Sequence, residues 1–203
     1  MNTGHRIHDI IFDALCGGDI IVTHFPMLRK RGIPDIGVTV HSHFLTFLTT
    51  VGQRLGFSAI TECPIAWAGD YSKLGDVRAD SVWFDRESLN PKVVIEFERF
   101  ERGDEGKLRQ KVENLAIASL ASPTLDLALL IYWVRSGSAP RSMESIVDVY
   151  RNGFRRRGHD VSPATVPLMI VKCVMRPASD GNSLLLGEFL RDQRNERLPM
   201  GRV

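Results

Sequence analysis

The sequence predicts an α/β protein with a mixed central β-sheet flanked by helices, and two observations support this prediction. The middle of the chain carries, in order, the patterns of one helix, three strands, a second helix and a further strand. Three consecutive strands followed by a helical crossover produce a sheet with both antiparallel and parallel neighbours. The run LDLALLIYWV over 125–134 is almost wholly apolar, which is typical of a strand buried on both faces.

The length of 203 residues is enough for one domain with a substantial core. We expect an N-terminal extension over 1–40, a core over 41–177 and a tail over 178–203, all in a single domain. The formal net charge is only +2, so any contact with nucleic acid must come from local basic patches.

The three cysteines are widely spaced. They form no CxxC pair, which argues against a zinc knuckle, and their odd number argues against a disulfide framework. The chain contains no apolar run of transmembrane length, and its N-terminus lacks the pattern of a signal peptide. We therefore expect a reducing compartment and a cytoplasmic protein.

The N-terminal extension carries weaker signals. Its apolar spacing predicts a helix over 5–15, a short strand over 19–25 and a loop over 26–34. That loop holds a basic cluster of Arg29, Lys30 and Arg31. Two interpretations stay open for this cluster: a solvated surface turn, or a contact with the phosphates of a nucleic acid.

The core begins with an amphipathic helix over 43–55, for which Ser42 is the expected N-cap. His41 and His43 flank its start, and a pair of histidines in this position is more typical of structural residues than of metal ligands. A strand over 58–65 follows. The loop over 66–75 contains Trp67, a candidate for stacking on a nucleic-acid base.

Two apolar strands then carry acids that a buried strand would not normally hold. Asp80 lies at the entry to the first strand, and Glu96 and Glu98 lie in the second, sixteen residues further on. Residues two apart in a strand share a face, so Glu96 and Glu98 point the same way. If the strands pair as a hairpin, Asp80 joins them in one small volume. Like charges at such range are costly unless a cation lies among them.

After these strands we expect a helix over 105–121, capped by Asp104, whose polar stripe holds Lys107, Gln110, Lys111 and Asn114. The buried strand over 125–134 comes next, followed by a helix over 143–154, a strand over 165–175 and a short helix over 184–190. The second of these helices is followed by Arg155, Arg156 and Arg157. These arginines suit either the C-terminal end of a helix dipole or a phosphate contact.

This arrangement resembles the PD-(D/E)XK nuclease superfamily, which has the restriction-endonuclease-like fold with an αβββαβ core. In that superfamily an acid begins the second core strand, and an acid-x-lysine triplet lies in the third. Arg78-Ala79-Asp80 occupies the first position in this chain, and Glu96-Phe97-Glu98 occupies the second. The resemblance covers about 43–134. It implies that Asp80 and Glu96 bind metal, with the backbone carbonyl of Phe97 as a further ligand.

The chain departs from the pattern at two points. Glu98 stands where the triplet lysine is expected, as in a minority of the superfamily, and the resemblance implies that it binds metal or positions water. Lys107 or Lys111 on the following helix could replace the lysine, and Gln110 lies where some branches have a glutamine. The first core helix also lacks the usual glutamate, for which Gln53 or Glu62 could substitute.

The resemblance and the chemistry lead to one functional hypothesis. We expect a metal-dependent endonuclease that hydrolyses phosphodiester bonds in double-stranded DNA with Mg²⁺, or with Mn²⁺ as a substitute. A single site in a short chain cuts both strands most simply as a homodimer. Two alternatives stay open: a catalytically inactive nuclease-like fold that binds nucleic acid or serves as a subunit of a larger complex, and an RNA-directed enzyme with the same core.

Overall fold

The computed structural model describes residues 7–65, 73–135 and 138–196. Trp67 therefore lies outside the described residues. The main strands are β1 (Ile33–Pro34), β2 (Ser58–Pro64), β3 (Arg78–Phe84), β4 (Pro91–Arg99), β5 (Leu127–Arg135), β8 (Leu168–Pro177) and β9 (Ser183–Arg191). The helices are α1 (Ile7–Cys16), α2 (Gly18–His24), α3 (Met27–Lys30), α4 (Gly37–Arg54), α5 (Glu105–Ala121) and α6 (Met143–Asn152).

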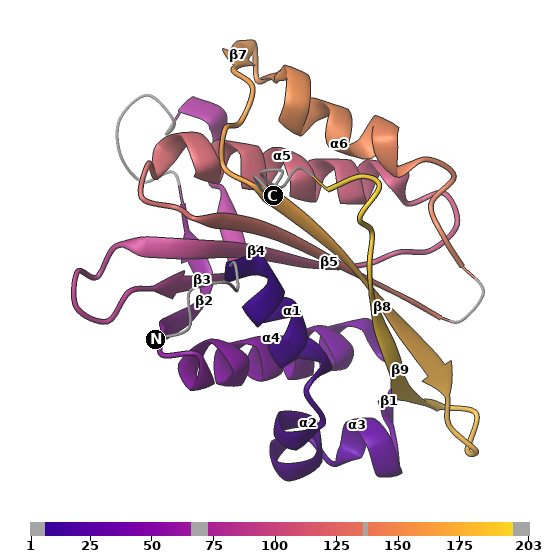
Figure 1. The fold of residues 1–203 in the computed structure, drawn as a ribbon. Helices are drawn as coiled ribbons and strands as arrows, with labels where there is room; N and C mark the ends of the chain where they lie inside the picture. The colour runs from indigo at the N-terminus through magenta and orange to yellow at the C-terminus, as the bar shows by residue number, and fades with distance from the viewer. Residues whose placement is uncertain (1–6, 66–72, 136–137, 197–203) are drawn as a thin grey trace.

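The seven main strands form one mixed sheet in the order β1-β9-β8-β5-β4-β3-β2 (Figure 1). β2, β3 and β4 are antiparallel neighbours, whereas β4, β5 and β8 run parallel. The parallel pair β4–β5 needs a crossover, which α5 supplies. The predicted α/β class with a mixed sheet is confirmed, and so is the order of helix, three strands, helix and strand from α4 to β5.

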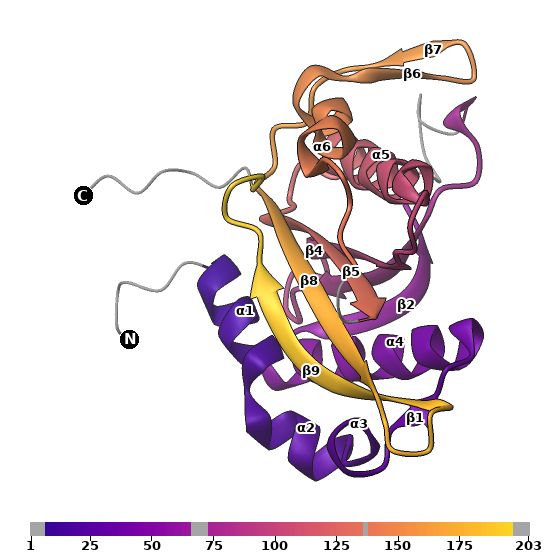
Figure 2. The same cartoon turned by 90° about the vertical axis from the view of Figure 1, so that its right-hand side faces the viewer.

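Helices cover both faces of the sheet (Figure 2). One core cluster joins α1 to α4 with one face, and its members include Phe47 and Phe97; the other joins α5 and α6 with the opposite face. β5 lies between them, and eight of its nine residues are buried. Burial on both faces explains why this strand is apolar throughout instead of alternating. No helix in the described ranges is long and apolar enough to cross a membrane.

The N-terminal segment departs from the prediction at three places. Residues 18–24 form α2 rather than a strand, and residues 27–30 form the helix α3 rather than a loop. In α2 only Ile21 is buried, so one-sided packing outweighs the strand preference of its β-branched residues. α4 begins at Gly37, which places Ser42 inside the helix instead of at its cap.

Two predictions for the C-terminal third are also wrong. Residues 183–191 form the strand β9 rather than a helix, because their backbone pairs with β8. α6 ends at Asn152, and Arg155 to Arg157 do not lie at the end of this helix. They belong to a separate two-stranded hairpin made of β6 (Phe154–Arg156) and β7 (His159–Val161). Its turn consists of Arg157 and Gly158, both with positive φ, a pattern that suits tight hairpins.

Candidate active site

The predicted hairpin of the two acidic strands is confirmed. Ser81 of β3 pairs with Ile95 of β4, so Asp80 and Glu96 lie next to each other on the face that α5 covers. Both side chains are buried. The backbone N–H of Phe97 donates a hydrogen bond of 2.7 Å to Oδ2 of Asp80, which ties the acid of one strand to the backbone of the other.

Lys111 of α5 reaches both acids. Its Nζ lies 3.0 and 2.9 Å from the two carboxylate oxygens of Asp80, and 2.6 Å from Oε2 of Glu96. Leu108 and Val112, its neighbours along α5, are fully buried and hold this face of the helix on the sheet. Burial alone would lower the pKa of Lys111, but the charges of Glu96 and Asp80 outweigh it and raise that pKa. The ammonium therefore stays charged between the two acids.

Glu96 has no exposed surface. Burial raises its pKa well above the ordinary glutamate value, and the nearby charge of Lys111 opposes this rise. Its second oxygen, Oε1, accepts a hydrogen bond of 3.0 Å from Nδ2 of Asn114. Oε2 has no hydrogen-bond partner among the described residues and is compensated only by its ion pair with Nζ of Lys111. Buried polar atoms normally have a hydrogen bond, so this oxygen is an exception within the site.

A histidine and a third acid approach Asp80 from its other side. Nε2 of His41 on α4 lies 3.8 Å from Oδ1 of Asp80 and 3.7 Å from Oε1 of Glu62 on β2. The three side chains offer ligand atoms that all lie within 4.8 Å of one another. Glu62 has a φ of +51°, an uncommon conformation for a non-glycine residue that is often found at functional sites.

The predicted helper residues are therefore only partly brought together. Glu62 is at the site, whereas Gln53 and Gln110 are exposed, and the Gln53 carbonyl accepts from Arg86 near the opposite end of α4. Lys107 is exposed and pairs with Asp104. For His41 the sequence favoured a structural role over metal binding. Its place at the site follows from the earlier start of α4.

Glu98 lies at the margin of the site. Its Oε1 accepts a hydrogen bond of 3.0 Å from the backbone N–H of Arg99. The side chain is partly buried, and burial raises its pKa although Lys111 exerts the opposite influence. The charge of Lys111 therefore influences the carboxyl group of Glu98, but Glu98 does not supply the basic group that the superfamily pattern expects at this position.

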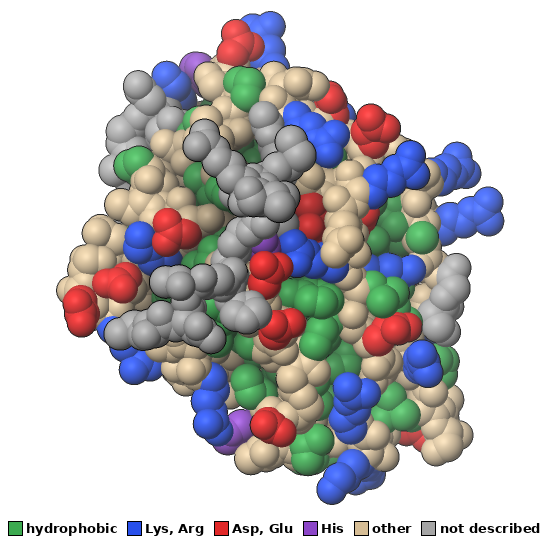
Figure 3. Space-filling view, viewed as in Figure 1, with side chains coloured by type: hydrophobic (Ala, Val, Ile, Leu, Met, Phe, Trp, Pro, Cys, Tyr) green, Lys and Arg blue, Asp and Glu red, His purple; other side chains and the backbone are tan. Residues whose placement is uncertain are grey.

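The basic residues proposed for phosphate contact lie in different places. Arg29 donates to the carbonyl of Gly187, and Lys30 and Arg31 are exposed beside it. Arg155 and Arg157 are exposed on the hairpin, whereas Arg156 turns inward to Asn114. Figure 3 shows Lys and Arg interspersed with Asp and Glu on the face in view. The basic residues proposed for phosphate contact thus do not form one continuous patch on this face, in line with the net charge of only +2.

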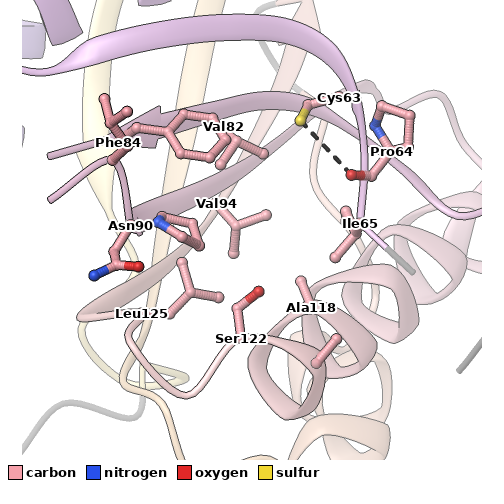
Figure 4. Close-up of a pocket in the computed structure, with 13 residues that line it drawn as sticks. Cys63, Pro64, Ile65, Val82, Phe84, Asn90, Val94, Ala118, Ser122 and Leu125 are labelled. Carbon is pink, nitrogen blue, oxygen red and sulfur yellow. Dashed lines mark hydrogen bonds between the residues drawn. The ribbon is translucent and has the colours of Figure 1, made fainter. Parts of the chain in front are cut away.

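Two hollows near β2 differ in character. One, of about 400 Å³, includes Glu62 in its lining, and most of its lining residues have polar side chains: His41, Ser42, Leu45, Thr46, Thr49, Thr61 and Glu62. The other, of about 340 Å³, lies beside α5 toward the hairpin turn of β3 and β4 (Figure 4). Apolar side chains such as Val82, Val94 and Leu125 line much of it. Of the site residues, His41 and Glu62 line the first hollow, and none lines the second.

Comparison with known proteins adds no assignment: no family model, curated protein or solved structure matches the chain.

Proposed function

We propose that the chain is a metal-dependent endonuclease that hydrolyses phosphodiester bonds in DNA. The supporting observation is the convergence of two buried acids and one lysine from three different elements. Nζ of Lys111 lies within 3.0 Å of oxygens of both Asp80 and Glu96. Two acids and a lysine are the groups that the restriction-endonuclease-like pattern requires, and here the helix supplies the lysine.

The donor chemistry of the site fits a divalent cation. Asp80 and Glu96 offer carboxylate oxygens, which Mg²⁺ and Mn²⁺ prefer. Glu62 adds a further oxygen beside Asp80, and His41 adds a nitrogen. In this proposal Asp80 and Glu96 hold the ion together with the backbone carbonyl of Phe97. A bound divalent ion would activate water and offset negative charge in the transition state.

The other side chains take roles that match their positions. Lys111 keeps its proton and donates hydrogen bonds from Nζ to a phosphate oxygen when it turns away from the acids. Glu98 has one oxygen committed to the backbone N–H of Arg99, so Oε2 is available to orient a water or accept its proton. Its raised pKa brings it nearer to neutral pH, where a general base works best.

A second candidate function rests on the same lysine. In the structure the ammonium already supplies a positive charge to both acids, so their negative charge is offset without any other cation. A nuclease-like fold of this kind can serve as a nucleic-acid-binding or assembly subunit that lacks catalysis. Binding of Mn²⁺ separates the two candidates, because only the first requires it.

The test is incubation of the chain with supercoiled plasmid in the presence of Mg²⁺, Mn²⁺ or EDTA. We expect cleavage that needs the metal and that disappears in Asp80→Asn and Glu96→Gln. Asp126→Asn is the matched control, because this carboxylate pairs with Lys92 at a half-exposed position. Metal-dependent cleavage that persists in Asp80→Asn would disprove the assignment. Linear product that appears without a nicked intermediate would support a homodimer on double-stranded DNA, and an RNA panel tests the other substrate class.

A further inference from the structure

The orientation of the Glu96 carboxylate depends on two neighbours. The group has no exposed surface, so bulk water cannot hold it. Lys111 lies beside Oε2, and the amide of Asn114 donates to Oε1. Lys111 sits at the rim of the site and is shared with Asp80. Asn114 is therefore the neighbour that can fix which way the carboxylate faces.

The amide of Asn114 is itself held in one orientation. Nη1 of Arg156 donates a hydrogen bond of 2.9 Å to Oδ1 of Asn114. A guanidinium has only donors, so it selects the amide oxygen and leaves the NH₂ group facing Glu96. If the amide turned over, its NH₂ would meet the donors of Arg156 and its oxygen would meet the carboxylate. Both contacts would be repulsive.

Arg156 comes from a unit outside the main sheet. It lies in β6, whose hairpin with β7 is a separate two-stranded sheet. Val161 of β7 is buried in a small cluster with Leu74, Val77 and, from α5, Ile117. The hairpin therefore packs on the helix that carries Asn114. The hairpin thus reaches the candidate site through one arginine.

We propose that Asn114 and Arg156 are positioning residues: Arg156 fixes the amide of Asn114, and Asn114 fixes the carboxylate of Glu96 for metal binding. This assignment gives Arg156 a role other than the phosphate contact expected from the sequence. It deepens the proposed function and rests on it, because it takes Glu96 as a metal ligand. Neighbours that orient metal ligands commonly contribute 10- to 100-fold (roughly) to affinity or activity.

The first experiment measures Mn²⁺ affinity by calorimetry. We expect about tenfold weaker binding in Asn114→Leu and in Arg156→Met, and partial recovery in Arg156→Lys, which keeps a donor. The controls are Asn152→Leu, which removes an exposed amide on α6 that bonds Asp148, and Arg54→Met at the far end of α4. If cleavage is observed, kcat should fall while KM stays unchanged, because neither residue touches substrate. Wild-type affinity in Arg156→Met would overturn the proposal.

A second experiment does not depend on metal or activity. Thermal unfolding of Arg156→Met, Glu96→Gln and the double variant should give non-additive shifts in Tm, because the two residues are linked. The same comparison in an Asn114→Leu background should give additive shifts, since the link is then absent. If the wild type binds no Mn²⁺ but the shifts in Tm are non-additive, the proposed function is wrong and the link between Arg156 and Glu96 through Asn114 is still supported. Additive shifts in the wild-type background would overturn the link itself.

Discussion

Nζ of Lys111 lies 2.6 Å from Oε2 of Glu96, a carboxylate with no exposed surface. The same nitrogen lies within 3.0 Å of both oxygens of Asp80. Two acids can lie side by side inside the protein because this single ammonium stands between them. The relationship makes Lys111 a structural group as well as a candidate catalytic one, and its removal should affect both properties.

Lys111→Met should destabilise the fold by about 3 kcal/mol, because removal of one partner leaves a buried charge without compensation. Glu96 would then take up a proton, since burial already raises its pKa. Urea unfolding at neutral pH measures the change. Lys107→Met is the control, because its pair with Asp104 is largely exposed, and it should stay within about 0.5 kcal/mol of the wild type. Equal stability of the two variants would contradict this account.

Divalent metal should stabilise Lys111→Met more than it stabilises the wild type. In the wild type an added ion must compete with an ammonium at the same oxygens, whereas in the variant the acids lack a cation. A ligand at 100 times its Kd stabilises by about 2.7 kcal/mol, which is several degrees in Tm for a chain of this size. Thermal unfolding with and without Mn²⁺ measures the effect. The idea fails if both proteins show the same shift, or if Lys107→Met behaves like Lys111→Met.

The core of the fold was predictable because its signals are local. The acids of β3 and β4 stand out in apolar strands, and the apolar run of β5 marks a strand with two buried faces. Alternation predicted that Glu96 and Glu98 share a face, and the expected hairpin pairing of the two strands brought Asp80 near Glu96. Lys111 was a candidate for the replacement lysine because it lies on the polar stripe of α5. Lys107 lies on the same stripe, so the sequence could not choose between them; the packing of α5 on the sheet puts Lys111 at the acids.

The remaining parts depend on contacts distant in the sequence. His41 joins the site because α4 begins six residues before the predicted start, and the Gly37 to Val40 segment contains glycine and β-branched residues, which are poor helix formers. Arg156 meets Asn114 across 42 positions, and no local pattern signals such a contact. β9 forms a strand because β8 offers an edge to it. Propensity is a weak guide where tertiary pairing decides.

Alkaline pH should destabilise the wild type more than Tyr132→Phe. Tyr132 pairs in register with Glu98, and burial, aided by the charge of Asp192, raises the pKa of its phenol to about 12. In the unfolded chain the phenol releases its proton at about pH 10, so the folded state holds this proton more tightly than the unfolded state does. The contribution is complete below that pH and is lost as pH rises toward 12. Urea unfolding at about pH 8 and about pH 11 measures the free energy of unfolding of both proteins. An equal loss of stability in the wild type and in Tyr132→Phe would argue against a buried phenol.

Gly153, which ends α6 directly before β6, and Gly158, in the turn of the β6–β7 hairpin, should respond differently to alanine. Both have positive φ. At Gly158 this costs alanine about 1 kcal/mol, whereas Gly153, with φ 79° and ψ 177°, lies in a region adopted essentially by glycine alone. At Gly153 an added Cβ would also collide with the backbone oxygen of Val161, whereas at Gly158 it would meet open space. We therefore expect Gly153→Ala to destabilise by about 3 kcal/mol and Gly158→Ala by about 1 kcal/mol.

The same pair of variants tests the coupling of the hairpin to the site. A collision at Gly153 displaces the strand that carries Arg156, so Gly153→Ala should weaken Mn²⁺ binding about as much as Arg156→Met does, roughly tenfold. Gly158→Ala leaves β6 in place and should bind Mn²⁺ like the wild type. Calorimetry on folded samples, checked by circular dichroism, gives both affinities. Equal affinities for the two alanine variants would mean that Glu96 keeps its orientation without the hairpin.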